Sequence, residues 1–187
     1  MCDNHAEKNI RPRLACRHER GLPWVIVAVL CAALLSFNGC ARHRRHLSIP
    51  DRAPSGAVSE SVPGIWPVDH PAMYMSSPYG EIRPGGRRHR GVDIAVPKGT
   101  PVSAAATGTT VFAGQQGAYG NIIILCHGNG YETAYAHLDR ILTQRGSRVR
   151  RGAVIGLVGA TGNATGPHLH YEVRKNGVDV NPMPYLP

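Results

Sequence analysis

The chain has 187 residues, with 22 glycines, 15 prolines and a net charge of +9. This length predicts one domain with appendages rather than several domains. Abundant glycine and proline, with little helical periodicity after the N-terminal region, argue against a helical fold and favour an all-β domain.

Residues 1–39 have the layout of an export signal. An uncharged apolar run, 24–37, follows a basic segment that contains Lys8, Arg11, Arg13, Arg17 and Arg20. This order is typical of a secretory signal with a long basic leader. The run has fewer than the roughly twenty apolar residues that span a membrane. We therefore expect a cleaved signal or, as the alternative, an uncleaved inner-membrane anchor, and both place the rest of the chain outside the cytoplasm.

The run ends in FNGC, which resembles a bacterial lipobox with Cys40 as the lipidated residue. Phe37 and Asn38 depart from the residues usual at their positions. Ala41 after the cysteine, by lipoprotein sorting rules, predicts the outer membrane of a Gram-negative cell, with the protein facing the periplasm. Cleavage would leave only Cys126 unmodified, so no disulfide is predicted, and Cys126 is interpreted as a small buried apolar residue.

Residues 40–65 contain a basic cluster, three prolines and several serines and glycines, but few large apolar side chains. Such a segment cannot bury enough surface to fold alone. We expect a flexible tether, which reaches at most about 80 to 90 Å when extended. A domain held at the membrane by the lipid or anchor could thus search the adjacent cell wall.

Residues 66–187 are expected to form the folded domain. Turn signals recur about every ten residues from Gly80 onward. Between them, strands are predicted at 91–96, 109–113, 122–126, 133–138, 153–158 and 169–174. They suffice for a compact antiparallel β-sheet core.

A set of histidines and one aspartate in this domain indicates a metal site. His168 and His170 are two residues apart in a predicted strand, so both project from one face. Gly91 lies between His89 and Asp93, and its freedom would let a turn bring both to one ion. One carboxylate with two imidazoles is a normal ligand set for Zn²⁺. A catalytic zinc site keeps three protein ligands and an open position, so further histidines point towards chemistry.

The motifs HRGVDIA, TAYAHLDR and GPHLHYEV resemble those of the M23 family of zinc metallopeptidases, the LytM and lysostaphin type that cut peptidoglycan cross-bridges. The resemblance runs from about Pro67 to the C-terminus. It implies a core like the duplicated hybrid motif, with zinc in a groove. The implied zinc ligands are His89, Asp93 and His170.

The same resemblance implies that His137 and His168 are catalytic histidines that do not bind the metal. Asn121 and Tyr135 would contact substrate. Zinc would lower the pKa of a water molecule towards about 7, and the two histidines would handle protons and stabilise the oxyanion. Which of them is the base stays open.

The implied substrate is the peptide cross-link of peptidoglycan. The lipobox, and the absence of a recognisable wall-binding domain, favour the D-Ala–meso-diaminopimelate bond of Gram-negative walls over Gly-Gly bridges. Regulatory protein partners remain open.

Two other functions remain as alternatives. A LytM-like module can activate a cell-wall amidase without cutting anything, but such modules have lost metal ligands that are all present here. A phosphotransfer domain of the glucose-permease type also uses two nearby histidines, yet it needs neither an export signal nor Asp93.

The basic clusters GGRRHR and RGSRVRR either bind carboxylates of peptide stems or form solvated faces. The export signal excludes nucleic acid as a partner. His127 is interpreted as structural, because it precedes a hairpin-turn sequence. Glu172 either orients a metal ligand or carries surface charge.

Overall fold

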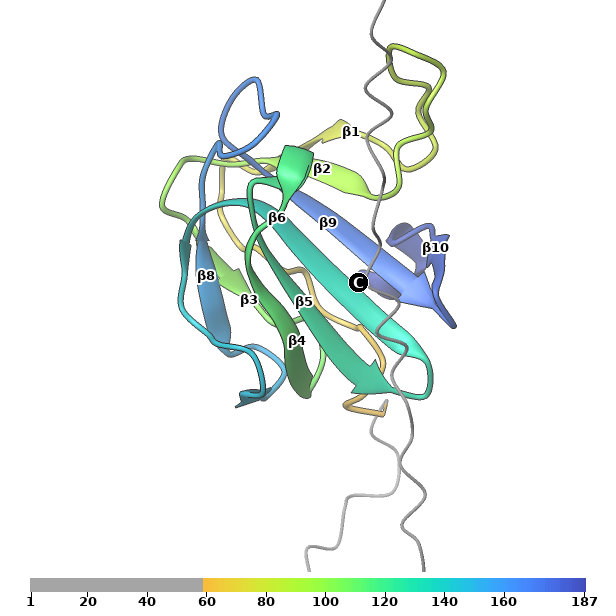
Figure 1. The fold of residues 1–187 in the computed structure, drawn as a ribbon, viewed down its shortest axis with the longest axis vertical. Coiled ribbons are helices and arrows are strands. Elements are labelled where there is room, and N and C mark those ends of the chain that lie inside the picture. The colour runs from red at the N-terminus through yellow and green to blue at the C-terminus, as the bar shows by residue number, and fades with distance from the viewer. Residues whose placement is uncertain (1–58) are drawn as a thin grey trace, which may run out of the picture. The chain divides into compact units, whose positions relative to one another are not determined.

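The computed structural model describes residues 59–187, which are built almost entirely from β-strands (Figure 1). The predictions for residues 1–39, for Cys40 and for most of the tether lie outside this range. No helix within 59–187 has the length and hydropathy needed to cross a membrane.

The strands join in one antiparallel sheet with the order β1-β2-β9-β6-β5-β4-β7. Strand β10 extends the sheet from β9, while β8 pairs with both β6 and β3. In chain order the elements are β1 (Tyr74–Ser77), β2 (Val92–Ala95), β3 (Pro101–Ser103), β4 (Gly108–Gln115), the 3₁₀ helix η1 (Gly117–Tyr119), β5 (Asn121–Gly128), β6 (Tyr131–Ile141), β7 (Arg148–Val149), β8 (Val154–Val158), β9 (His168–Lys175), β10 (Val178–Val180) and the 3₁₀ helix η2 (Met183–Tyr185).

The all-β prediction is confirmed, and each of the six predicted strands is found as β2, β4, β5, β6, β8 or β9. The prediction missed β1, β3, β7 and β10, which have only two to four residues and so show no clear periodicity. The sequence does contain a signal for β10, the hairpin-turn pair Asn176-Gly177 before it. Both residues have positive φ, 51° and 78°, as a two-residue hairpin turn requires.

The two faces of the central strands carry different side chains because successive residues of a strand point in opposite directions. One face supplies the main core, which β3, β8 and the segment before β1 cover. Its fully buried members include Val92, Ile94, Ile123, Leu125, Tyr135, Leu138, Leu169, Tyr171 and Val173. The opposite face carries a smaller cluster of Ile122, Ile124, Ala134 and Ala136.

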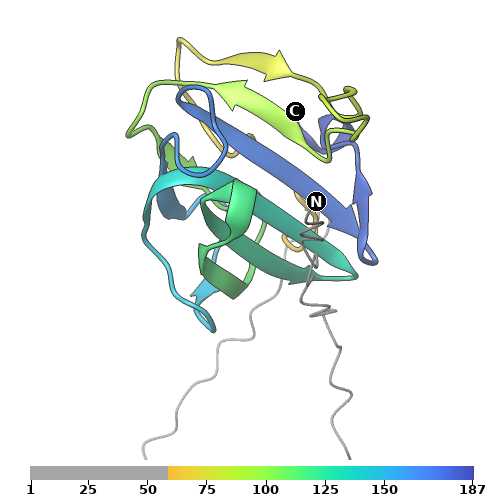
Figure 2. The ribbon, with the colours of Figure 1, turned by 45° about the horizontal axis from the view of Figure 1, so that its top comes forward.

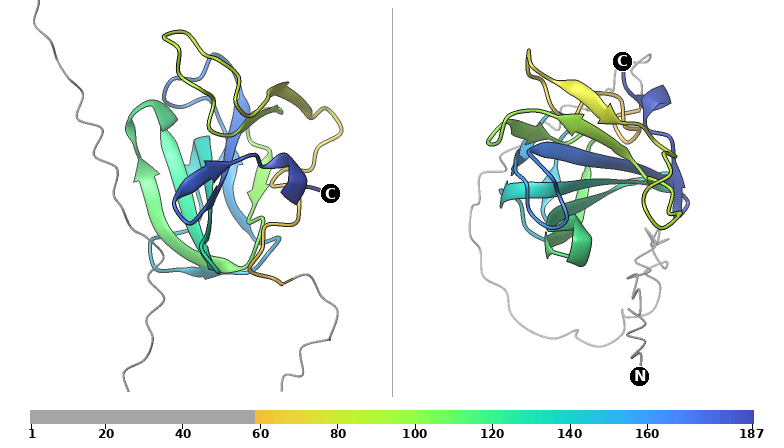
Figure 3. Two further views of the ribbon diagram at one scale, coloured as in Figure 1. Left: turned by 90° about the vertical axis from the view of Figure 1, so that its right-hand side faces the viewer. Right: turned by 90° about the horizontal axis from the view of Figure 1, so that it is seen from above.

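Strand β9 lies in the middle of the domain, between β2 and β6 (Figure 2). The loop 159–167 joins the start of β9 from one end, and η1 lies beside β6. Twist carries β1 and β4 out of a common plane, as the side view shows (Figure 3). The side chains of β9 that point away from the main core are therefore surrounded by β2, η1 and this loop.

The first described residues lie against the domain. The Gly64 N–H donates to the Ala105 carbonyl at 3.1 Å, and the Thr107 N–H donates to the Glu60 carbonyl at 2.8 Å. Pro63 is buried. Residues 59–65, which the sequence assigns to the tether, are thus packed on the sheet.

Candidate metal centre

Strand register brings two of the three predicted ligands together. Asp93 of β2 pairs directly with His170 of β9, and Ala136 of β6 pairs with His170 from the other side. All three side chains lie on the sheet face opposite the main core. Because Ala136 is small, the rings of Tyr119 and His137 can approach His170, with centroids 5.7 and 5.9 Å from its own.

His89, three residues before β2, completes a set of three donor atoms. His89 Nε2 lies 3.1 Å from Asp93 Oδ1 and 3.0 Å from His170 Nδ1, and the last two atoms are 2.7 Å apart. The three residues are 5 to 6% exposed. Within residues 59–187 this is the one group of three such side chains that could hold a metal ion.

Gly91 has a different role from the one expected. It does not have a positive φ, so it forms no special turn between His89 and Asp93. A Cβ at this position would overlap the Tyr171 carbonyl of β9. The glycine is needed because the two backbones approach closely where β2 begins to pair with β9.

The second polar atom of each donor residue is held by another group. The His89 Nδ1–H donates to the Pro78 carbonyl at 2.8 Å. Arg83 binds Asp93 Oδ2 at 2.5 Å, and His170 Nε2 lies 3.0 Å from Glu172 Oε1. These contacts aim two imidazole lone pairs and one carboxylate oxygen at a common point. This donor set fits Zn²⁺, with three protein ligands and an open position.

Glu172 is a fully buried carboxylate that orients His170. The Tyr119 hydroxyl donates to its Oε1 at 2.7 Å, and Arg174 binds its Oε2 at 2.5 Å. Burial alone would raise the pKa of Glu172, but His170 and Arg174 hold it at about 2. Burial and the Glu172 charge raise the pKa of Tyr119 to about 12, so its hydroxyl remains a donor. Of the two roles open for Glu172, the structure shows the orienting one.

Protons compete with a metal ion for the donor set. Burial alone would raise the pKa of Asp93, but hydrogen bonds from His170, His89 and Arg83 hold it well below its ordinary value. Burial would lower the pKa of His170, whereas Asp93 and Glu172 raise it to about 9. A metal ion must displace this proton, so its binding becomes stronger as the pH rises towards 9.

His137 reaches the same site through a break in strand β6. Its φ of 61° lies in the left-handed region, which few residues other than glycine adopt. The pairing between β5 and β6 shifts register at this point, as in a β-bulge. Regular alternation would send His137 into the core with Tyr135, but the bulge turns it onto the site face. Leu138 fills the core position instead.

Main-chain carbonyls fix the orientation of His137 and His168. His137 Nδ1 lies 2.8 Å from the Thr161 carbonyl, and His168 Nδ1 lies 2.9 Å from the Gly166 carbonyl. A carbonyl accepts only from N–H, so both rings carry the proton on Nδ1 and leave Nε2 free. The ring centroids are 4.7 Å apart, and His168 Nε2 lies 3.8 Å from Asp93 Oδ1. Burial lowers the pKa of His137 to about 4, which keeps this imidazole neutral at pH 7.

The loop 159–167 that supplies these carbonyls is braced by η1. Gly162 has a φ of 72°, and a Cβ there would overlap the Ala118 carbonyl and Gly120. The Asn163 N–H donates to the Ala118 carbonyl at 2.9 Å. Thr161 Oγ1 donates to the Leu138 carbonyl at 2.8 Å, which ties the loop to the bulge. Backbone packing, more than side chains, therefore sets the position of the loop.

The sequence profile of peptidase family M23 matches residues 87–182, which is just over half of the chain. The match contains the five residues of the site, here called the cluster: His89, Asp93, His137, His168 and His170. The chain belongs to peptidase family M23.

Curated relatives include enzymes and an activator. The M23 domain is 50% identical over 119 residues to the DD-carboxypeptidase/endopeptidase Mpg of Neisseria meningitidis, a match that covers 60% of this chain and 27% of that protein. It is 36% identical over 141 residues to the uncharacterized lipoprotein YgeR of Escherichia coli, with 72% and 54% covered. It is also 37% identical over 122 residues to the E. coli murein hydrolase activator EnvC, with 65% and 28% covered. The chain thus spans about a quarter of the length of the first of these relatives.

A solved structure has the same fold. The zinc-containing peptidase from Vibrio cholerae superimposes with a TM-score of 0.61 at 38% sequence identity. The match covers 65% of this chain and 39% of that one. The zinc in that peptidase agrees with the donor set of this M23 domain.

The structure separates Tyr135 from the other predicted site residues, so the prediction that it contacts substrate is corrected. Tyr135 is fully buried in the main core, on the opposite side of the sheet from His170. Its hydroxyl accepts a hydrogen bond from the Ala105 N–H at 2.8 Å. The prediction rested on the family resemblance alone. Tyr135 keeps a regular register with Ile123 and Tyr171 and faces the core, and the bulge turns only His137 onto the site face.

Asn121 lies next to the site and forms hydrogen bonds to the backbone that carries the site residues. Its Nδ2 donates to the Leu138 carbonyl at 3.0 Å, and its backbone N–H donates to Thr161 Oγ1 at 3.0 Å. It thus joins β5 to the end of β6 and to the loop 159–167. Substrate contact by Asn121 stays a prediction.

His127 is structural, as expected. It is 4% exposed and lies 2.6 Å from Thr133 Oγ1 through Nε2 and 3.1 Å from the Thr107 carbonyl through Nδ1. The prediction that Cys126 forms no disulfide is wrong. Cys126 is disulfide-bonded.

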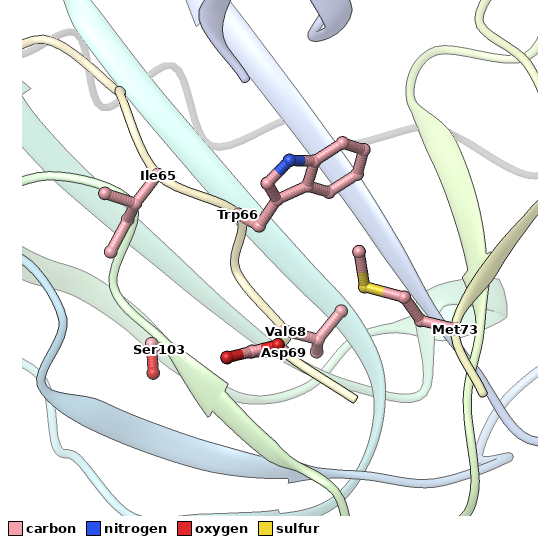
Figure 4. A pocket seen from close by; sticks show the side chains of 6 residues that line it. All are labelled: Ile65, Trp66, Val68, Asp69, Met73 and Ser103. Carbon is pink, nitrogen blue, oxygen red and sulfur yellow. The ribbon is translucent and has the colours of Figure 1, made fainter. Parts of the chain in front are cut away.

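The hollow beneath Trp66 lies elsewhere and offers little chemistry (Figure 4). It has a volume of about 440 Å³ and is lined by Ile65, Trp66, Val68, Asp69, Met73 and Ser103. None of the cluster histidines reaches it. Reactive groups in the domain are therefore concentrated above β9.

Sequence reasoning missed the residues that orient the cluster. Arg83 binds both Asp93 and Ser77, while Thr161 holds His137. Arg83 lies within SSPYGEIRPGG, a stretch that the resemblance covered but to which no role was given. Tyr119 has no comparable signal, because its contact with Glu172 spans 53 residues.

Proposed function

We propose that this protein is a zinc-dependent endopeptidase that hydrolyses peptide cross-links of bacterial peptidoglycan. One observation carries the proposal: three converging donor atoms lie beside two histidines, each with Nδ1 held by a carbonyl and Nε2 free. A structural metal site has no use for such histidines, because its coordination is closed by protein ligands.

The chain's own residues supply binding and proton transfer. His89, Asp93 and His170 would hold Zn²⁺, which polarises a carbonyl and acidifies water when bound. Neutral His137 can accept a proton from the attacking water through Nε2. His168, 4.7 Å away between ring centroids, can stabilise the oxyanion and return a proton to the leaving amine. The roles of the two histidines can be exchanged in this scheme.

The D-Ala–meso-diaminopimelate cross-link is the proposed bond. The relative Mpg, named as a DD-carboxypeptidase/endopeptidase, supports it. The proposed location is the periplasmic face of the outer membrane, through lipid on Cys40, with a signal anchor in the inner membrane as the alternative. The relative YgeR, named as a lipoprotein, supports this location.

The test uses the full chain, solubilised in detergent and incubated with purified sacculi. We expect release of muropeptide fragments, loss of release with EDTA and recovery with added zinc. His137→Ala and His168→Ala should each slow release by about 10²- to 10⁴-fold. His70→Ala is the matched control, because within residues 59–187 the one hydrogen bond of the His70 side chain is from the Ala72 N–H. Mass spectrometry of the fragments identifies the bond, and unchanged rates in both site variants would refute the mechanism.

An amidase activator is the second candidate, favoured by the 37% identity to EnvC. A complete donor set is not needed for activation, which makes catalysis the better explanation. The two functions differ in one measurement. An activator would release no fragments by itself but would accelerate release by an added amidase, and EDTA treatment of the activator would not matter.

A further inference from the structure

A surface at the end of the domain away from the histidines combines exposed aliphatic and basic side chains. Leu142 and Val154 are each 50% exposed, and the Leu142 N–H donates to the Ile155 carbonyl at 2.8 Å, so they lie on adjacent segments. Between them is a hollow of about 530 Å³ that Arg148 also lines. Exposed aliphatic residues grouped in this way mark an interaction site more often than scattered ones do.

Three arginines lie in or next to the segment that lines this hollow. Arg148 lines it, and Arg145 and Arg150 are close to it in the chain; all three are exposed. Within residues 59–187 none of them forms an ion pair with a carboxylate. The one acidic residue between 139 and 151, Asp139, is already bound by Lys98 at 2.8 Å. The surface formed by Leu142, Val154 and these three arginines, here the basic apolar surface, is therefore positively charged.

The chain enters the domain beside this surface. Arg151 Nη2 donates to the Ser59 carbonyl at 3.0 Å and to the Val62 carbonyl at 2.8 Å. Figure 1 shows the start of the described chain, in orange, and the loop between β7 and β8 at the same lower end of the domain. A tether that runs to a membrane would leave the domain on this side.

We propose that the basic apolar surface docks on a membrane that contains anionic phospholipid. The inference rests on the proposed membrane attachment of the N-terminal segment. Arginine guanidinium groups would bind lipid phosphates, while Leu142 and Val154 enter the headgroup boundary. The two aliphatic side chains favour lipid over the hydrophilic wall polymer, which would satisfy the arginines alone.

Docking on this surface leaves the metal centre free. Strand β8 leads from Val154 to Val158, next to the loop 159–167 that holds both Nδ1–H groups. Five strand residues span roughly 15 Å, at about 3.3 Å each. The docked domain would hold its histidines about one strand length above the membrane surface.

The experiment places an environment-sensitive fluorescent amino acid at position 142 of the full chain. The protein is reconstituted in vesicles of phosphatidylcholine alone or with 30% phosphatidylglycerol as the probe lipid. We expect a blue shift and quenching by lipid-borne quenchers only with the anionic lipid, and reversal in high salt. Arg148→Gln with Arg150→Gln should lower the ratio of docked to free domain roughly thirtyfold, at about fivefold for each arginine. Arg87→Gln with Arg88→Gln, an equal charge change in another exposed loop, should leave it unchanged.

Equal emission in both vesicles, or an equal loss in both double variants, would overturn the proposal. A response to added sacculi but not to anionic lipid would assign the surface to the wall polymer instead. If the chain binds to neither kind of vesicle, the proposed membrane attachment of the N-terminal segment is wrong. Hydrolysis of soluble muropeptides by the wild-type chain, measured in the same vesicles, separates failure of docking from failure of the proposed activity.

Discussion

The five cluster residues divide into two groups that are held in different ways. The first group is the donor set His89, Asp93 and His170, of which Asp93 and His170 lie on paired strands. Charged side chains hydrogen-bond to it from behind: Glu172 to His170 and Arg83 to Asp93. His137 and His168 are instead backed by the Thr161 and Gly166 carbonyls at the loop 159–167. The Glu172 carboxylate strengthens the attraction of His170 for a cation, while the Arg83 guanidinium fixes the position of Asp93 without adding to that attraction. A carbonyl instead selects the protonated nitrogen of a histidine and adds no net charge. The first arrangement suits binding, and the second suits proton exchange.

Removing one member of each group should produce the largest and clearest difference. Asp93→Ala removes a donor, so we expect both zinc and activity to be lost. His137→Ala should retain zinc at one ion per chain while activity falls by about 10²- to 10⁴-fold. Metal analysis by atomic emission and fragment release from sacculi measure the two effects. Loss of zinc from the His137 variant would place it among the ligands and erase the division.

Weakening the charged backing should produce the next largest effect. Glu172→Gln keeps the shape but removes the negative charge behind His170, so zinc affinity should fall by about 10- to 100-fold. In the metal-free protein the pKa of His170, about 9, should fall as well. Chelator competition and NMR titration measure these changes. Glu60→Gln, an exposed carboxylate, is the control, and equal losses in both variants would contradict a specific role.

His127 is another histidine whose Nδ1 faces a main-chain carbonyl, and it lies away from the metal centre. The Thr107 carbonyl lies at its Nδ1, and burial lowers its pKa to about 4. Between pH 6.5 and 4 the unfolded chain binds more protons at this residue, so its share of stability is lost as the pH falls. At pH 5 the loss is about 2 kcal/mol. Denaturation of the wild type and of His127→Gln across this range should show a flatter pH dependence in the variant.

The loop that provides the carbonyls can be disturbed without touching a histidine. Gly162→Ala forces a side chain into the left-handed region and against the Ala118 carbonyl, which should cost about 1–2 kcal/mol of stability and reduce activity while zinc is retained. Gly166→Ala is the matched control, because its Cβ meets no atom within 4 Å. Thermal unfolding and zinc content distinguish the two. Loss of zinc in the Gly162 variant would show that both groups depend on the loop.

The sequence predicts those parts of the domain that follow strand periodicity. His168 and His170 share a face as their spacing indicates, and the six longer strands are found where alternation and turn residues place them. The prediction for Tyr135, which rested on the family resemblance, failed because Tyr135 keeps a regular register with Ile123 and Tyr171 and faces the main core. Nothing local in TAYAHL shows that His137 takes a φ of 61°, because that conformation depends on Thr161 and Asn121, which lie elsewhere in the chain. The groups that orient the ligands are missed for the same reason.

The pairing of Asp93 with His170 also has a consequence for folding. The two residues are 77 positions apart in the chain. Contacts between such distant residues form slowly, because the entropy of closing a long loop must be lost first. An unfolded chain would therefore lack the assembled donor set, and zinc uptake during refolding would report that β2 has paired with β9.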